Sequence, residues 1–263
     1  MGVFGVCHFH CQLVYLPTPL LICMFGDVTP YLARGFLAAI GTQITVSHQD
    51  RIPPPGALVV VSNHRSLLDA PLLTAALDRT VRFACHHYMS RVPILNEVVT
   101  AMGCFPLDPP GQKPRRLFNQ ASQSLQSGEA IGIFPEGAQP MVQTPTPQEM
   151  GQFHRGFAHL VLRVPVPKLA ILPVAISSLE ETISPVAPFR LFSLFDPSEP
   201  LFQRPGWHPA VHYQRVHLSV GRPLWIAQDD QERYQGRGAA KLARNITQAC
   251  YAEISQLLKE GAA

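Results

Sequence analysis

The sequence predicts an α/β fold: a single domain with a central, mostly parallel sheet flanked by helices, preceded by an apolar N-terminal segment. Short apolar runs, typical of strands buried on both faces, alternate with segments of helical periodicity through the middle of the chain. A length of 263 residues suits one domain with a sizeable core. We divide the chain into an apolar N-terminal segment (1–50), the α/β domain (51–225) and a helical C-terminal tail (226–263).

The first elements are predicted from periodicity and from the breaks between them. YLARGFLAAIGTQITV (31–46) has apolar residues at helical spacing and indicates a helix running into a strand. The RIPPPG stretch interrupts the chain, and ALVVVS (57–62) then has the continuous apolar character of a buried strand. In the predicted helix 66–77, Ser66 stands at the N-cap and Asp69 three residues later, the spacing of a capping box.

The later elements continue the alternation. We predict strands at 80–85, 104–107, 130–134, 168–177 and 215–221, and helices at 94–103, 113–128 and 152–163. The tail from 229 to 259 indicates a long polar helix, broken near GRG. Proline is abundant, with 26 residues, and its clusters at 139–147 and 185–209 indicate long surface loops.

Composition narrows the classes of function. Charged residues make up 15% of the chain, against roughly 25% in an average soluble protein, which favours exposed apolar surface and contact with a membrane or partner. A formal charge of +3 is too small to indicate nucleic-acid binding. The six cysteines form no disulfide framework, which favours a reduced, cytosol-facing setting. CHFHC near the N-terminus lacks a second ligand pair, so we expect no metal site.

The N-terminal segment raises the question of a membrane. CQLVYLPTPLLICMF (11–25) is apolar, but it is shorter than the roughly 20 residues of a spanning helix, and Pro17 and Pro19 interrupt it. It lacks the features of a signal peptide. We expect it to lie in the membrane interface, which makes the protein membrane-associated on the cytoplasmic face. The alternative is an element packed on the domain.

His64 and Asp69 form the first candidate constellation. His64 directly follows a buried strand and precedes a helix, at the strand end where α/β sheets bind ligands. Asp69 lies about one helical turn further on, so its carboxylate can reach back to the imidazole. Such a carboxylate fixes the tautomer and stabilises the imidazolium, which suits a general base at neutral pH. The alternative is a helix cap beside an ordinary turn histidine.

The second constellation is FPEG (134–137), at the end of another buried strand. Pro135 ends the ladder, and Gly137 allows the backbone to approach a ligand closely. Glu136 places a carboxylate where burial is costly unless the group has a partner. The alternative is that Glu136 is an ordinary turn residue.

Taken together, NHRSLLD (63–69) and FPEG resemble the glycerolipid acyltransferase family, whose best-known members are the lysophosphatidic acid acyltransferases. RVPILNEVVTAMGCFPLD (91–108) is similar to the family's second block, and LAILPVAIS (169–177) to its fourth. The resemblance covers roughly residues 55–180 and implies the glycerolipid acyltransferase fold.

The resemblance implies a mechanism in which His64, oriented by Asp69, deprotonates the acceptor hydroxyl. The oxygen then attacks the thioester of acyl-CoA or acyl-carrier protein without a covalent acyl-enzyme, and the chain indeed has no G-x-S-x-G elbow. Neither metal nor cofactor is implied. The implied acceptor is a lysophospholipid, foremost 1-acyl-sn-glycerol-3-phosphate. The substrate-binding residues that we assign are Asn63, Phe134, Pro135, Glu136, Gly137 and Arg155.

The chain departs from the family pattern where the acceptor's phosphate is bound. Ala138 and Gln139 follow FPEG in place of the usual Thr-Arg, and Pro109 stands where the second block usually has an arginine. A phosphate dianion favours arginine in bidentate reach. Candidate replacements are Arg65, Arg91, Arg115, Arg116 and Arg155, of which we favour Arg155 because it precedes a helix that follows the FPEG loop.

Three alternatives stay open at this point. The acceptor is another lysophospholipid or alcohol, the protein is a non-catalytic lipid-binding protein of the same fold, or the dyad serves a hydrolase or transacylase.

Overall fold

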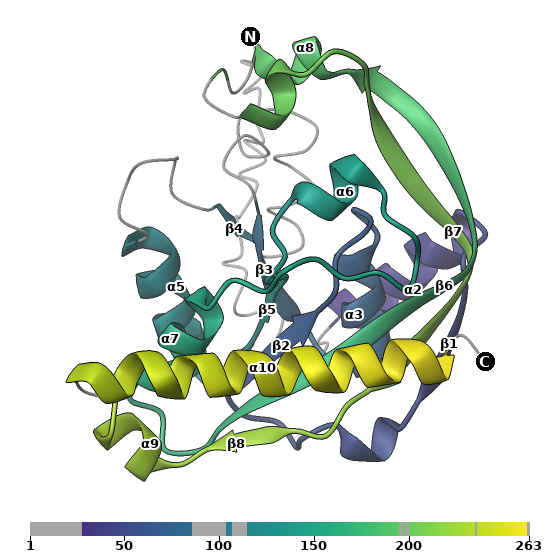
Figure 1. Cartoon of the computed structure of the whole chain (residues 1–263). Helices are drawn as coiled ribbons and strands as arrows, with labels where there is room; N and C mark the ends of the chain where they lie inside the picture. The colour runs from purple at the N-terminus through teal and green to yellow at the C-terminus, as the bar shows by residue number, and fades with distance from the viewer. Residues whose placement is uncertain are drawn as a thin grey trace, which may run out of the picture.

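The computed structural model describes residues 28–85, 104–106, 115–194, 197, 200–234 and 236–261. The apolar segment 11–25 and the predicted helix 94–103 lie outside these residues. The described chain forms an eight-stranded sheet in the order β1-β7-β6-β2-β5-β3-β4, with β8 paired to β6 (Figure 1). The predicted α/β fold with a mostly parallel sheet is confirmed.

Four neighbouring strands on one side of the sheet are all parallel to one another. They are β2 (Leu58–Ser62), β5 (Ala130–Ile133), β3 (Val81–Cys85) and β4 (Phe105–Pro106). β2 runs parallel to both β5 and β6, and all five of its residues are buried. A strand covered on both faces needs apolar side chains at every position, which explains the unbroken run that predicted it.

Helices cover both faces of the sheet (Figure 1). Leu58 and Val60 point to a core shared with α2 (Thr29–Ala39) and α3 (Asp69–Leu77). Alternate β2 residues, Val59 and Val61, point to a second core on the other face. The helices that contribute to this second core are α5 (Arg115–Gln126), α7 (Gly156–Arg163) and α10 (Gly236–Gly261).

A long antiparallel ribbon corrects the prediction for the proline-rich region. β6 (Leu169–Pro188) and β7 (Trp207–Val220) pair out to Pro188 and Trp207, so most of the predicted loop at 185–209 belongs to strands or to short helices at the ribbon's tip. Pro185 lies opposite Pro209. Each strand of a two-stranded ribbon has a free edge, and a proline is tolerated where its missing N–H would face that edge. The tip carries α8 (Phe189–Ser193) and η3 (Pro200–Gln203).

Both ends of the described chain pack on the sheet. β1 (Gln43–Ser47) runs parallel to β7, so the sheet begins before the boundary that we predicted at residue 51. The tail is helical and broken as predicted, into α9 (Gln228–Glu232) and α10, and α10 buries Ala243, Cys250 and Ile254 in the core. The remaining short elements are η1 (Gln49–Arg51), α6 (Gln139–Gln143) and β8 (Leu224–Ile226). Within the described residues, no helix is both long and apolar enough to cross a membrane.

Candidate active site

The two sequence motifs meet at the carboxyl ends of neighbouring strands. β2 leads into the loop that holds His64, and β5 leads into Phe134. Because β2 and β5 are parallel partners, their ends lie at the same edge of the sheet. The His64 imidazole stacks on the Phe134 ring with centroids 4.0 Å apart and planes within 9°. The structure therefore brings together residues that lie about 70 positions apart in the chain.

A second ring lies beneath this stack. Phe134 stacks in turn on Phe83 of β3, with centroids 5.3 Å apart. Phe83 lies directly over Gly132, where a Cβ atom would come within 2.1 Å of the Phe83 ring. Glycine at 132 thus leaves room for the Phe83 ring against the backbone of β5.

His64 and Asp69 form the hydrogen-bonded pair that the spacing predicts. His64 Nδ1 lies 2.8 Å from Asp69 Oδ2, and the Asp69 side chain is fully buried. The same oxygen accepts the backbone N–H groups of Arg65, at 2.7 Å, and Ser66, at 2.8 Å. An ionised carboxylate only accepts, which assigns the imidazole proton to Nδ1 and leaves Nε2 as an acceptor. The arrangement is that of a general base oriented by a carboxylate.

The capping-box prediction is right in one half only. Asp69 does accept the Ser66 N–H, but α3 begins at Asp69 and not at Ser66. The Ser66 hydroxyl instead accepts the N–H of Leu68 and donates to the Val211 carbonyl of β7, at 2.6 Å. Asp69 thus orients the imidazole and also stabilises the turn before its helix, so the two interpretations of the residue are compatible.

Asn63 uses its side chain to extend the sheet. Its Oδ1 accepts the Ile176 N–H at 2.8 Å, and its Nδ2 donates to the Ile176 carbonyl at 2.9 Å. The side chain is buried, and these two bonds fix the end of β2 to β6. We predicted Asn63 as a substrate-binding residue, whereas in the structure it holds the loop that carries His64.

Arg65 is occupied by an ion pair with Glu181 of β6. The Arg65 Nε lies 2.9 Å from Glu181 Oε2, and Arg65 also donates to the Pro145 carbonyl. The two side chains are only 8% and 12% exposed. Burial alone would raise the pKa of the Glu181 carboxyl, but the hydrogen bonds from Arg65 hold that pKa below its ordinary value. Arg65, one of the candidate phosphate ligands, therefore already has its guanidinium bound to Glu181 of the β6/β7 ribbon.

Glu136 joins two loops through backbone groups. Its Oε1 accepts the His64 N–H at 3.0 Å, and its Oε2 accepts the Gly151 N–H. Burial raises the pKa of this carboxyl, although the two N–H donors oppose the rise. We expected Glu136 to hold the acceptor hydroxyl. In the structure both oxygens already bind backbone, although each retains lone pairs that can accept a further donor.

The rest of the FPEG loop lies next to Arg155. The Pro135 carbonyl accepts the N–H of His154 at 2.9 Å, which sets Arg155 beside the loop at the start of α7 with its side chain exposed. Gly137 has a φ of +71°, a conformation that favours glycine. Ala138 and Gln139 lie at the start of α6. Pro109 and Arg91 lie outside the described residues.

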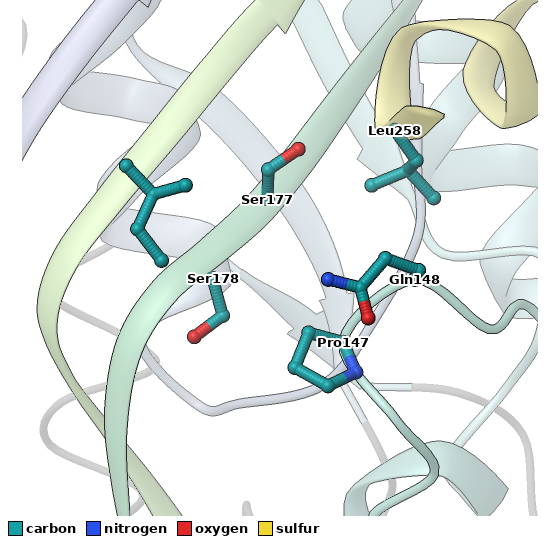
Figure 2. A pocket seen from close by; sticks show the side chains of 6 residues that line it. Pro147, Gln148, Ser177, Ser178 and Leu258 are labelled. Carbon is teal, nitrogen blue, oxygen red and sulfur yellow. The ribbon is translucent and has the colours of Figure 1, made fainter. Parts of the chain in front are cut away.

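A small hollow lies beside the part of β6 that holds the loop. Figure 2 shows its lining, which includes Ser177 and Ser178 of β6 together with Pro147, Gln148 and Leu258. The interior measures about 10 Å³. That is close to the space needed by one water molecule, so this hollow is too small for a lipid chain.

Sequence reasoning missed Tyr213, the residue that completes the environment of Asp69. Tyr213 of β7 is fully buried, and its hydroxyl donates to Asp69 Oδ1 at 2.8 Å. It lies 144 positions from Asp69, in a strand predicted to begin only at residue 215. The apolar and polar alternation of residues 211–218 was the one available signal, and it indicates burial without naming a partner.

The Acyltransferase family profile matches residues 43–177, a range that contains both motifs and the strands that hold them. The chain belongs to the Acyltransferase family. This confirms the resemblance to the glycerolipid acyltransferases that the two motifs indicated. The match spans β1 to the inner part of β6, so Tyr213 and Glu181 lie beyond it.

Two relatives extend the comparison. The chain is 30% identical over 138 residues to N-acylphosphatidylethanolamine synthase of Arabidopsis thaliana, which covers 49% of this chain and 47% of that protein. It thus spans about half the length of the curated relative that it matches. The crystal structure of the 1-acyl-sn-glycerophosphate acyltransferase PlsC from Thermotoga maritima matches with a TM-score of 0.56 at 18% identity, covering 88% of this chain and 77% of that one. At this identity, the likeness shows the fold.

Proposed function

We propose that the protein transfers a fatty acyl group from an acyl thioester to the hydroxyl of a glycerolipid, with His64 as general base. The observation that carries the proposal is the pairing of His64 Nδ1 with a fully buried carboxylate. Among the described residues, no side chain or backbone group hydrogen-bonds to Nε2, the nitrogen that would take the proton of the acceptor. A dyad held this firmly argues against a purely lipid-binding protein.

The chemistry follows from these positions. Nε2 takes the proton of the acceptor hydroxyl as its oxygen bonds to the thioester carbonyl carbon. Asp69 stabilises the imidazolium that forms. The carbon–sulfur bond then breaks, and the imidazolium returns the proton to the departing thiolate of CoA or acyl-carrier protein. The ester and the free thiol are the products, and no other cofactor takes part.

The acceptor that we propose first is 1-acyl-sn-glycerol-3-phosphate, which would give phosphatidic acid in phospholipid biosynthesis. One observation favours a second candidate, a lysophospholipid or amine-bearing phospholipid without a terminal phosphate dianion. Arg65 is bound to Glu181, and Ala138 and Gln139 supply no positive charge beside the FPEG loop. The match to an N-acylphosphatidylethanolamine synthase is consistent with such an acceptor.

We also propose that the protein works at a membrane surface on the cytoplasmic side. Among the described residues, exposed large apolar side chains gather on α2 and around the tip of the β6/β7 ribbon, besides single ones elsewhere on the surface. Those on α2 are Tyr31, Leu32 and Phe36, and those near the tip include Val186, Leu191, Leu194 and Trp207. Clusters of this kind favour contact with lipid, where the glycerolipid acceptor of the proposed reaction would be found.

The decisive experiment measures acyl transfer to a panel of acceptors. Purified protein receives a long-chain acyl-CoA or acyl-carrier protein with lysophosphatidic acid, lysophosphatidylcholine, lysophosphatidylethanolamine or phosphatidylethanolamine. We expect His64→Ala to lower kcat by about 10²- to 10⁴-fold, the range for loss of a general base. His159→Ala, which removes a histidine bonded to Tyr234 away from the site, is the matched control. Equal activity in His64→Ala would refute the dyad, and thiol release without an acylated lipid would indicate a hydrolase.

Arg155 is tested within the same panel. If its exposed guanidinium binds the acceptor's phosphate, Arg155→Ala should raise KM for lysophosphatidic acid by about tenfold, as expected for one charged hydrogen bond, and leave kcat unchanged. Arg163→Ala changes an arginine at the other end of α7 and should have no effect. An unchanged KM in Arg155→Ala would assign the residue to the solvated surface.

A further inference from the structure

We infer that Tyr213 is a positioning residue for the proposed acyl transfer: its hydroxyl fixes the Asp69 carboxylate so that Oδ2 faces the His64 imidazole. The predicted change in kcat rests on the proposed function. The predicted change in the state of the His64 ring rests on geometry alone.

The contacts of Asp69 divide cleanly between its two oxygens. Oδ2 accepts from His64 Nδ1 and from two backbone N–H groups of the loop, whereas Oδ1 accepts from Tyr213. The Asp69 side chain is fully buried, so no bulk water can replace the Tyr213 hydroxyl without rearrangement. Within the part of the chain that the structure describes, the Tyr213 hydroxyl is thus the group that holds Asp69 Oδ1. This hydrogen bond opposes rotation of the carboxylate plane.

Tyr213 is well suited to be a permanent donor. It is fully buried and lies on β7 directly across from Glu181 of β6, the partner of Arg65. Burial raises the pKa of the Tyr213 hydroxyl well above its ordinary value, and the nearby Asp69 charge adds to this effect. The phenol thus keeps its proton throughout the pH range in which an enzyme of this kind is assayed.

Four charged or titratable side chains among the described residues lie close to the His64–Asp69 pair. Arg65 lies on the same loop, Glu136 follows β5, Glu181 lies on β6 and Tyr213 on β7. Arg65 and Glu181 neutralise each other in their ion pair. Loss of the Tyr213 hydroxyl thus changes one hydrogen bond to Asp69 and no net charge near it.

The test compares Tyr213→Phe with wild-type protein. The variant keeps the buried ring and loses only the donor. We expect kcat to fall by about tenfold, the effect of one hydrogen bond to a charged group, with KM for both substrates unchanged. Without the phenol donor, the Asp69 carboxylate attracts the imidazolium more strongly and so stabilises the protonated ring. The acid limb of the pH–rate profile should therefore move to higher pH. Wild-type kcat together with a wild-type profile would overturn the inference.

Two controls separate positioning from packing. Tyr234→Phe removes another hydroxyl bonded to a histidine, His159, and should change neither kcat nor the profile. In an Asp69→Asn background, Tyr213→Phe should have almost no further effect on kcat, because it acts through the carboxylate. An equal tenfold loss in that background would mean that Tyr213 acts on the fold in general, and would overturn the inference.

A readout without substrate keeps the two proposals distinguishable. Nitrogen NMR of the His64 ring, assigned by comparison with His64→Ala, reports its tautomer and titration midpoint. We expect a single Nδ1–H tautomer in wild type, and a mixture of tautomers or a raised midpoint in Tyr213→Phe. If wild type shows no acyl transfer but these spectra differ, the proposed function fails and the positioning role stands. Identical spectra remove the positioning role whatever the activity.

Discussion

The β6/β7 ribbon has two parts that differ in what they contact. The inner ribbon (174–183 with 211–220) binds the His64 loop through four residues, which are Ile176, Glu181, Val211 and Tyr213. The outer ribbon (184–188 with 207–210) continues the same strand pairing but exposes apolar side chains. One pair of strands thus holds the candidate catalytic loop at one end and presents an apolar surface at the other. Substitutions in the two parts should therefore change different properties.

The largest effect is expected where the inner ribbon meets the dyad. In Asp69→Asn, the side-chain oxygen can still accept the three N–H groups that Oδ2 now binds. The amide nitrogen then faces Tyr213, whose oxygen can accept an N–H from it. Loss of the charge that stabilises the imidazolium should lower kcat by up to about 10⁴-fold, the upper end of the range for general acid–base catalysis. Steady-state kinetics of the purified variant checks the result.

Thermal unfolding of the same variant provides the control. We expect the melting temperature to change little, because the three N–H bonds to the side-chain oxygen survive. A large loss of stability with modest loss of kcat would mean that Asp69 mainly stabilises the turn before α3.

A smaller effect, on stability, is expected at the Arg65–Glu181 pair. Arg65→Met leaves Glu181 buried without its cation, which should reduce the free energy of unfolding by about 3 kcal/mol. Arg215→Met is the matched control. Arg215 pairs with Glu180 on the same ribbon, but these side chains are 58% and 57% exposed, and such pairs contribute little. Denaturant unfolding at pH 7 compares the two variants.

The pH dependence gives this prediction a sign. The pKa of Glu181 is lower in the fold than its ordinary value, so the pair stabilises the protein above the unfolded pKa of about 4.3. That stabilisation is lost as the pH falls through the folded pKa. The difference between wild type and Arg65→Met should therefore shrink below about pH 4. A difference that is constant with pH would assign the effect to packing of the arginine stem.

The smallest effect on the protein itself is expected in the outer ribbon. Trp207 is 57% exposed, so Trp207→Ser should leave the melting temperature and the turnover of detergent-dispersed substrate unchanged. Its binding to vesicles of phosphatidylcholine and phosphatidylglycerol should weaken several-fold, because an aromatic side chain is withdrawn from the interface. Sedimentation with vesicles measures this. Unchanged vesicle binding would move the proposed membrane contact to α2 or to another face.

The sequence predicted the elements whose signal is local. The buried strands before His64 and Phe134, the flanking helices and the His64–Asp69 pair could all be read from runs and spacings within short windows. The length of the ribbon could not, because Pro185 and Pro209 indicate loops until their positions on free strand edges are known. Glu181 and Tyr213 were missed for a related reason: their roles depend on strand register across more than 100 positions.

Gly132 shows how the lack of a side chain can shape the surroundings of a distant histidine. The His64 imidazole stacks on Phe134, Phe134 stacks on Phe83, and the Phe83 ring occupies the space that a Cβ atom at residue 132 would need. A methyl group at residue 132 would therefore displace the Phe83 ring and disturb the row of three rings that ends at His64. The orientation of the imidazole thus depends, through two phenyl rings, on a hydrogen atom in β5.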